Sequence, residues 1–191
     1  MSFSYMTNPV VFLIDTFVSL YILAIMLRFL LQWIRADFYN PISQFLVKIT
    51  HPPLRLLRRF IPAVGRIDSS SLVLALVLQM AANFAILALK GLMIGIPALL
   101  LLSVADLLKI VLDIFVYAIL AGAILSWVGP AGYGAFSTIL YSLTAPILNV
   151  CRRMLPDTGV IDLSPLIALV LLQVAKMVLL PPLQELARLL S

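Results

Sequence analysis

Four long apolar stretches, separated by shorter polar segments, dominate the chain. They cover residues 10–31, 72–89, 104–125 and 165–180. Each comes close to the ~20 apolar residues that a helix needs to cross the hydrocarbon core of a bilayer. Asp15 and Arg28 lie toward the two ends of the first stretch, where a long side chain can reach the headgroups, so neither excludes a span. The pattern predicts an all-α integral membrane protein with four membrane-spanning helices.

Two segments next to these stretches are less clearly defined. Residues 91–102 are apolar, but they are too short for a span and are interrupted by a glycine and a proline. We expect an interfacial linker or a helical extension there. Pro181 and Pro182 follow the fourth stretch, which therefore either ends there or kinks and continues toward Leu190.

An internal repeat organises the whole sequence. Trp33 and Trp127 are 127 − 33 = 94 residues apart, and the same offset relates many other residues of rare types. The further pairs are Pro62 with Pro156, Gly65 with Gly159, Asp68 with Asp162, Arg58 and Arg59 with Arg152 and Arg153, and Gln79 with Gln173. We therefore predict two tandem units, over residues 1–97 and 98–191. Because each unit has two spans, both enter the membrane in the same orientation, as parallel repeats.

The positions of the basic residues predict how the chain is oriented in the membrane. The loop between the first two spans holds Arg35, Lys48, Arg55, Arg58, Arg59 and Arg66, and the loop between the last two holds Arg152 and Arg153. The segment before the first span has no lysine or arginine, and the central linker has only Lys90. Since these residues accumulate in cytoplasmic loops, both basic loops are predicted to be cytoplasmic, with Arg188 as the one discordant charge.

Composition argues against a soluble fold and against several kinds of site. Of the 191 residues, 63% are hydrophobic and 11% charged, against about half and about a quarter in soluble domains. The net charge of +5 fits the cytoplasmic loops of a membrane protein better than a nucleic-acid-binding surface. With one cysteine, Cys151, and one histidine, His51, a single chain forms neither a disulfide nor a zinc cluster.

Each basic loop is predicted to contain an amphipathic helix. In the first loop, Asn40 followed by Pro41 opens a helix over residues 42–50. The two prolines after His51 break this helix before a second turn over residues 54–60. Apolar and cationic side chains fall on different sides of that turn, which suits a helix lying against anionic headgroups. An ordinary basic loop that only sets topology is the alternative.

The segments that return into the membrane after both loops carry helix-start signals. Asp68 can cap the second span directly, and Ser164 followed by Pro165 provides a cap and a first-turn proline for the fourth. The recurrence of proline and glycine in both copies favours structured loops.

The first loop and its second copy resemble the repeat of the YggT family. The run from Pro52 to Asp68 reads Pro-Pro-Leu-Arg-Leu-Leu-Arg-Arg-Phe-Ile-Pro-Ala-Val-Gly-Arg-Ile-Asp, and the second copy extends from Ala145 to Pro165. The resemblance covers nearly the whole chain. It implies a bacterial cytoplasmic-membrane protein, often with two repeats, whose molecular activity is not established.

The resemblance also implies several biological contexts, without naming a catalytic residue. Plastid relatives are associated with haem attachment to a b-type cytochrome and with membrane or nucleoid organisation, and bacterial relatives with tolerance of osmotic stress. The second copy has Asn149 where the first has Arg55. If the loops bind lipid or a partner, we expect the first loop to dominate.

The inventory of reactive residues argues against catalysis. His51 precedes two prolines and has no nucleophile or orienting motif around it, so we expect no enzymatic activity. A b-type haem site with two histidine ligands needs a second histidine, although methionine or a partner's histidine is an alternative ligand. We therefore expect no bound cofactor or metal, and an assembly role in place of haem carriage.

Polar side chains recur within the predicted spans. The set is Asp15, Gln79, Asn83, Asp106, Lys109, Asp113, Gln173 and Lys176. Such residues face the bundle interior, because an unpaired charge in hydrocarbon is costly. We favour hydrogen bonds between helices over the alternative, a polar path for an ion or proton, which a four-span bundle would form only as an oligomer. From its depth, Lys176 is predicted to pair with Asp113, and the other two aspartates are the alternatives.

Two functional classes remain. The favoured one is a non-enzymatic inner-membrane scaffold or assembly factor whose basic loops bind anionic lipid or a membrane-protein partner. The residues that would make these contacts are Arg55, Arg58, Arg59, Arg66, Arg152 and Arg153. The alternative is a small channel or transporter component involved in ion or osmotic balance, acting as a homo-oligomer. Nucleic acid is not an expected partner.

Overall fold

The computed structural model describes residues 3–61, 68–128, 134–154 and 162–190. These residues form six helices and no strand, which confirms the all-helical prediction. The helices are α1 (Phe3–Trp33), α2 (Pro41–Leu57), α3 (Ser69–Leu89), α4 (Ile96–Val128), α5 (Ala135–Met154) and α6 (Ser164–Leu189).

Three helices of the described chain are long and apolar enough to cross a membrane. They comprise Pro9–Trp33 of α1, the whole of α3 and the whole of α6. These helices contain the first, second and fourth apolar stretches, so the chain is a multi-pass membrane protein. The third stretch lies inside α4, which runs without interruption for 33 residues. Its assignment as a fourth span stays a prediction.

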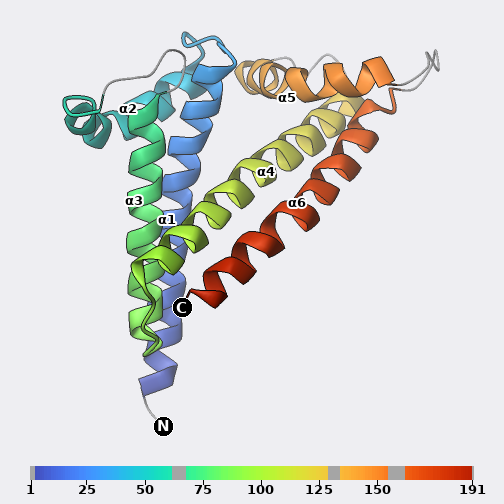
Figure 1. The fold of residues 1–191 in the computed structure, drawn as a ribbon. Coiled ribbons are helices and arrows are strands. Elements are labelled where there is room, and N and C mark those ends of the chain that lie inside the picture. Colours follow the sequence, from blue (N-terminus) through green and yellow to red (C-terminus); the bar gives the residue numbers. More distant parts are fainter. Residues whose placement is uncertain (1–2, 62–67, 129–133, 155–161, 191) are drawn as a thin grey trace.

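The two repeats have the same direction. Helices α1 and α3 form one antiparallel pair, and α4 and α6 form a second pair that is inclined to the first (Figure 1). Helices α2 and α5 lie across the same end of the two pairs, as expected for parallel repeats (Figure 1). The main core gathers near this end, where its fully buried side chains include Ile22, Ile25, Leu54, Ile119 and Leu143.

The prediction that Pro52 and Pro53 break the first amphipathic helix is wrong, because α2 continues through both prolines. A proline removes its own N–H bond and crowds the preceding turn. The hydrogen-bonding pattern nevertheless resumes after the pair, where the Arg58 N–H donates to the Leu54 carbonyl at 2.9 Å. Thr50 and Leu54, on either side of the prolines, are both fully buried. Packing of both halves against the bundle therefore outweighs the two lost backbone bonds.

Two open questions about helix ends are resolved in favour of continuation. Helix α6 passes through Pro181 and Pro182 and ends at Leu189. Between α3 and α4, the residues from Ile96 onward already belong to α4, so this part of the linker is a helical extension. Pro97 is tolerated because the backbone N–H groups in the first turn of a helix have no acceptor within the helix, so the missing N–H of proline costs no hydrogen bond.

Candidate functional site

Helices α2 and α5 are joined at their N-termini. The Asn40 side-chain oxygen accepts from the Ile42 N–H at 2.9 Å, which confirms Asn40 as the N-cap of α2. Its Nδ2 donates to the carbonyl of Ala135, the first residue of α5, at 2.6 Å. Because one side chain both starts α2 and contacts α5, the two helices form a continuous layer over the spans.

A buried arginine ties α2 to the first span. Arg28 is only 5% exposed, and its Nη1 donates to Thr50 Oγ1 at 2.7 Å. The Thr50 hydroxyl in turn donates to the Leu46 carbonyl at 2.6 Å, and the Tyr21 hydroxyl donates to the Ile49 carbonyl at 3.2 Å. The expectation that Arg28 reaches the headgroups is therefore wrong, because α2 covers its guanidinium.

The Arg58–Asp68 ion pair connects the end of α2 with the start of α3. Asp68 is 2% exposed, and its carboxylate also accepts from the Ser71 hydroxyl at 2.9 Å. It occupies the N-cap position but does not cap the helix backbone, so that part of the prediction is wrong. Burial by itself raises the pKa of Asp68. Hydrogen bonds from Arg58 and Ser71, with the charges of Arg58 and Arg28, outweigh burial and leave this pKa below its ordinary value of 3.8.

The second repeat has a looser version of the same pair. Arg152 Nη2 lies 2.7 Å from Asp162 Oδ2, but the two side chains are 55% and 45% exposed. Asp162 Oδ1 accepts from the Ser164 N–H at 2.9 Å. Leu163 occupies the N-cap position of α6 and Ser164 is already helical, so the predicted cap at Ser164 is wrong, whereas Pro165 lies in the first turn as predicted. Hydrogen bonding from Ser164, and to a lesser extent Arg152, lowers the pKa of Asp162. Gly122 stands where the first repeat has Arg28, so no buried arginine anchors α5 in this way.

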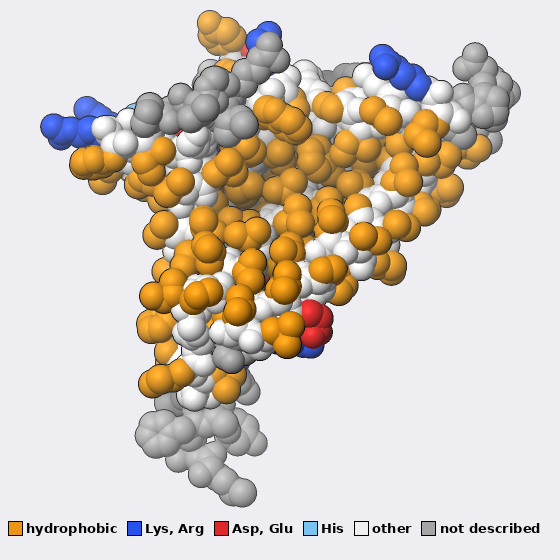
Figure 2. Space-filling model, in the orientation of Figure 1, with side chains coloured by type: hydrophobic (Ala, Val, Ile, Leu, Met, Phe, Trp, Pro, Cys, Tyr) orange, Lys and Arg blue, Asp and Glu red, His pale blue; other side chains and the backbone are white. Residues whose placement is uncertain are grey.

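The outer surface of the two amphipathic helices combines cations with large apolar side chains. Arg55, Arg58, Arg59, Arg152 and Arg153 are all exposed. On the same segments, the exposed apolar side chains include Phe45, Leu56, Phe60, Val150 and Met154. Figure 2 shows lysine and arginine gathered at this end, while apolar side chains cover the spans. Arg66, Pro62, Gly65, Pro156 and Gly159 lie outside the described residues.

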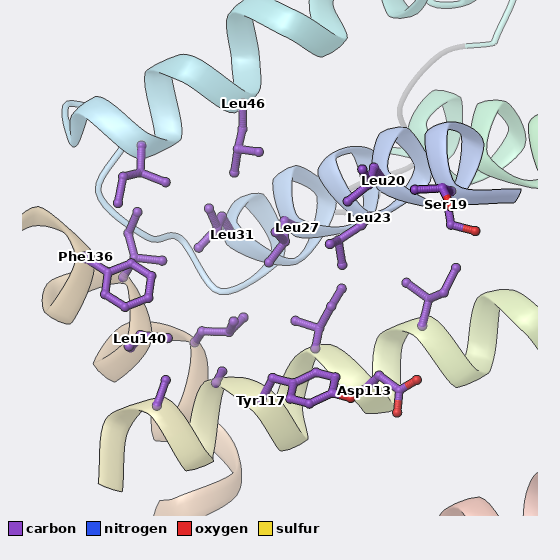
Figure 3. Close-up of a pocket in the computed structure, with 18 residues that line it drawn as sticks. Ser19, Leu20, Leu23, Leu27, Leu31, Leu46, Asp113, Tyr117, Phe136 and Leu140 are labelled. Carbon is purple, nitrogen blue, oxygen red and sulfur yellow. The ribbon is translucent and has the colours of Figure 1, made fainter. Parts of the chain in front are cut away.

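An apolar cavity of about 610 Å³ lies between α1 and α4, beneath α2 and α5 (Figure 3). Leu31, Leu46, Phe136 and Leu140 line one end, and Ser19 and Asp113 lie at the other (Figure 3). The remaining lining is almost wholly aliphatic. Its shape and lining can accommodate a hydrocarbon chain. The sequence carries no signal for it, because its walls are ordinary apolar positions drawn from four helices.

A polar cluster joins the two repeats at the contact between α3 and α4. Asn83 Nδ2 donates to Asp106 Oδ2 at 2.9 Å and to Ser103 Oγ at 3.2 Å. Gln79 Nε2 donates to the same Asp106 oxygen at 3.2 Å and to Asn83 Oδ1 at 3.3 Å. The predicted hydrogen bonding between helices is therefore present for Gln79, and the structure adds Ser103 to it.

A second polar contact joins α4 to α6. Lys176 Nζ and Asp113 Oδ1 form an ion pair, which confirms the predicted partner. Both side chains are largely buried, at 16% and 29% exposed. The pair stabilises the packing of α4 against α6, the two long helices of the second repeat.

The other polar and aromatic residues singled out in the sequence are not brought together. Asp15 is exposed on α1 and accepts from the Ser19 hydroxyl at 3.5 Å, and Lys109 is exposed on α4. Gln173 is exposed on α6, in contrast to its buried counterpart Gln79. Trp33 is exposed in the last turn of α1, and Trp127 belongs to the last turn of α4. Among the described residues, no group of three or more His, Cys, Asp or Glu side chains could hold a metal ion.

Comparisons with known proteins identify the repeat. A model of the CCB3/YggT family matches residues 7–89 and again residues 101–183, and the two starts differ by 101 − 7 = 94, the offset of the internal repeat. An uncharacterized protein of Pseudomonas aeruginosa is 40% identical over 174 residues, which cover 90% of this chain and 88% of that protein. The uncharacterized protein YggT of Escherichia coli K12 is 39% identical over 170 residues, covering 89% and 88%. No solved structure matches the chain.

Proposed function

The chain belongs to the CCB3/YggT family, whose bacterial relatives carry names that assign no activity, and from this premise we propose a scaffold function. The protein is a non-enzymatic scaffold or assembly factor of the bacterial inner membrane. It binds anionic lipid through α2 and α5, which lie in the cytoplasmic interface of the membrane. A membrane-protein partner would be held against the same surface.

One observation carries this proposal: two amphipathic helices lie across the same end of the spans and expose arginine beside large apolar side chains. Such a helix lies in the membrane interface, with its apolar side chains in the acyl boundary and its cations at the phosphates. Each arginine near an anionic surface contributes about 1 kcal/mol of attraction. The arginines are concentrated at one end of the molecule, which the distribution of basic residues makes the cytoplasmic one.

The cavity beneath α2 and α5 supports the same interpretation. Its walls are apolar and it lies within the depth of the spans (Figure 3). A lipid whose headgroup binds at the arginine-bearing helices would place an acyl chain at this level. The lining then gives the lipid chain an apolar contact that a free amphipathic helix does not offer.

We propose that α4 is the fourth span. Its 33 residues correspond to about 50 Å of helix, which crosses a ~30 Å hydrocarbon core even when the helix is inclined. Its aspartates do not oppose insertion, since Asp106 accepts from two amides of α3 and Asp113 pairs with Lys176 of α6. Both ends of the chain then lie outside the cytoplasm.

Cysteine labelling tests this topology. In a Cys151→Ala background, Arg59→Cys is expected to react with a membrane-impermeant maleimide only from the cytoplasmic side, and Met93→Cys only from the opposite side. Both positions are exposed at opposite ends of the helix bundle, so access does not limit labelling. Labelling of both cysteines from one side would exclude the four-span topology.

Lipid titration tests the scaffold proposal. The double change Arg55→Gln/Arg59→Gln is expected to weaken binding of phosphatidylglycerol about 10- to 30-fold, because two interfacial charges are lost. Binding of phosphatidylcholine should stay unchanged. Native mass spectrometry of the detergent-solubilised protein with each lipid measures both affinities. Neither arginine belongs to a salt bridge among the described residues, so the fold is preserved.

Two control variants sharpen this titration. Lys90→Gln removes an exposed cation from the other end of α3 and should leave phosphatidylglycerol binding unaltered. Arg153→Gln removes the repeat counterpart of Arg59. We expect a smaller loss than for the double change, because only one interfacial charge is removed; α5 has no second cation to remove at this site, since Asn149 stands where α2 has Arg55. Equal loss of both lipids, or no loss, would count against headgroup binding by these arginines.

Ion conduction has less support in the arrangement of the described charges. Asp106 and Asp113 each have a partner on a neighbouring helix, so they stabilise packing and do not line an open path. The cavity wall is almost wholly apolar, with Asp113 at one end, which is unfavourable for a hydrated ion.

A further inference from the structure

Gln173 places an exposed amide in the middle of an apolar helix. It lies nine positions after Ser164, the first residue of α6, or about 14 Å along the helix axis. That distance puts it well inside the ~30 Å hydrocarbon core. Helix α6 is also the least buried of the three candidate spans, with 11% of its apolar window buried inside the chain against 22% for α1 and α3.

The same position in the first repeat shows what this amide lacks. Gln79 is 7% exposed and donates to both Asp106 and Asn83. In the second repeat the counterpart of Asn83 is Met177, which offers no comparable hydrogen-bond partner. The described structure provides no hydrogen bond for the Gln173 side chain within its own chain. Lipid tails provide none either, so an exposed amide at this depth is costly.

Gln173 belongs to a continuous exposed stripe along α6. The stripe consists of Leu166, Val170, Gln173, Met177, Pro181 and Gln184, all exposed. Their spacing of three or four residues places them on one face of the helix. A mainly apolar face with an amide at its centre is the pattern by which spans associate, through close packing and hydrogen bonds between helices.

We propose that two copies of the chain associate through this stripe, with the two Gln173 side chains hydrogen-bonded to each other across a two-fold axis along the membrane normal. Each amide has an NH2 donor and a carbonyl acceptor, so two identical amides satisfy each other reciprocally. A two-fold axis brings the same patch of both subunits together and makes this pairing automatic. Lys176, on the adjoining side of α6, already pairs with Asp113 and does not compete for the amide.

Disulfide cross-linking in native membranes tests the contact. In a Cys151→Ala background, Met177→Cys is expected to form a cross-linked dimer on mild oxidation, because position 177 is one turn from Gln173 on the same stripe. Val178→Cys is the matched control, since it is exposed at nearly the same depth but is turned by about 100° around the helix. Equal cross-linking of the two variants, no cross-linking of Met177→Cys, or a product with another protein's mass would overturn the proposal.

Substitution of the amide tests its role. Gln173→Leu is expected to raise the dimer dissociation constant in liposomes about fivefold to tenfold, measured by energy transfer between labelled copies at decreasing protein-to-lipid ratios. Gln173→Asn keeps the amide and should retain most of the association. The Gln173 side chain is exposed on α6, so the fold tolerates either change. Equal dissociation constants for the native chain and Gln173→Leu would refute the amide contact. This proposal does not depend on lipid binding by α2 and α5.

Discussion

Replacing Lys176 with leucine is expected to lower the free energy of unfolding by about 3 kcal/mol, because it leaves the Asp113 carboxylate without its partner inside the membrane. The single change Asp113→Leu should cost a similar amount, since it strands the ammonium group. The double change should recover part of the loss, because two leucines leave no uncompensated charge. Unfolding of the four proteins in mixed detergent micelles gives the complete cycle.

The exposed ion pair between Glu185 and Arg188 on the same helix provides the control. Glu185 is 63% exposed, so Glu185→Gln should leave the unfolding free energy nearly unchanged. Strict additivity of the Lys176 and Asp113 substitutions would mean that the two side chains do not interact in the folded protein. A favourable coupling would place the pair among the contacts that hold α4 against α6.

The second large effect is expected at Asp68. Asp68→Asn should destabilise the protein by about 3 kcal/mol, because it removes the only carboxylate that faces Arg58 and the buried Arg28 in the described residues. The repeat counterpart is the matched control. Asp162→Asn breaks an ion pair that is about half exposed and should cost less than about 1 kcal/mol. Chemical unfolding of both variants measures the difference.

The pH dependence of stability checks the same site. The pKa of Asp68 is depressed in the folded protein, so its contribution is fully present above the ordinary value of 3.8 and is lost as the pH falls through the folded pKa. The native chain should lose stability over that acid range more steeply than Asp68→Asn does. Equal costs for the Asp68 and Asp162 substitutions would argue that the two repeats hold their loops equally tightly. Parallel acid profiles of the native chain and Asp68→Asn would show that Asp68 does not contribute to the pH dependence.

The two repeats differ in how firmly their amphipathic helices are attached to the rest of the bundle. In the first, Arg28, Thr50 and the Arg58–Asp68 pair attach α2 to the spans beneath it. In the second, glycine occupies the position of Arg28, and the equivalent ion pair faces outward. Both repeats thus contain the signature arginine and aspartate, but the aspartate of this ion pair is buried only in the first repeat. The more cationic and more firmly held helix α2 is therefore the stronger candidate for headgroup binding.

Much of the architecture follows from the sequence alone, because it depends on local properties. Transfer into hydrocarbon is decided by the apolar length of each segment, so hydropathy located all four apolar stretches. The 94-residue offset identified the duplication. The prediction of two spans per unit implied a common direction of the repeats, which is the direction that the helices have (Figure 1). The Asn40 cap and the Lys176–Asp113 pair were also predictable, since they follow from side-chain chemistry and from depth along a helix.

The tertiary structure decided everything that depends on how helices pack against one another. Local propensity predicts that Pro52 and Pro53 end the helix, but α2 continues through them because Thr50 and Leu54 are buried on either side. The cover provided by α2 turns Arg28 from a surface residue into a buried one. The inclination of the second helix pair opens the apolar cavity, which no run of residues encodes. Repeat symmetry predicts equal environments for Gln79 and Gln173, yet only one is buried, because α3 packs between α1 and α4 whereas α6 lies at the edge of the bundle.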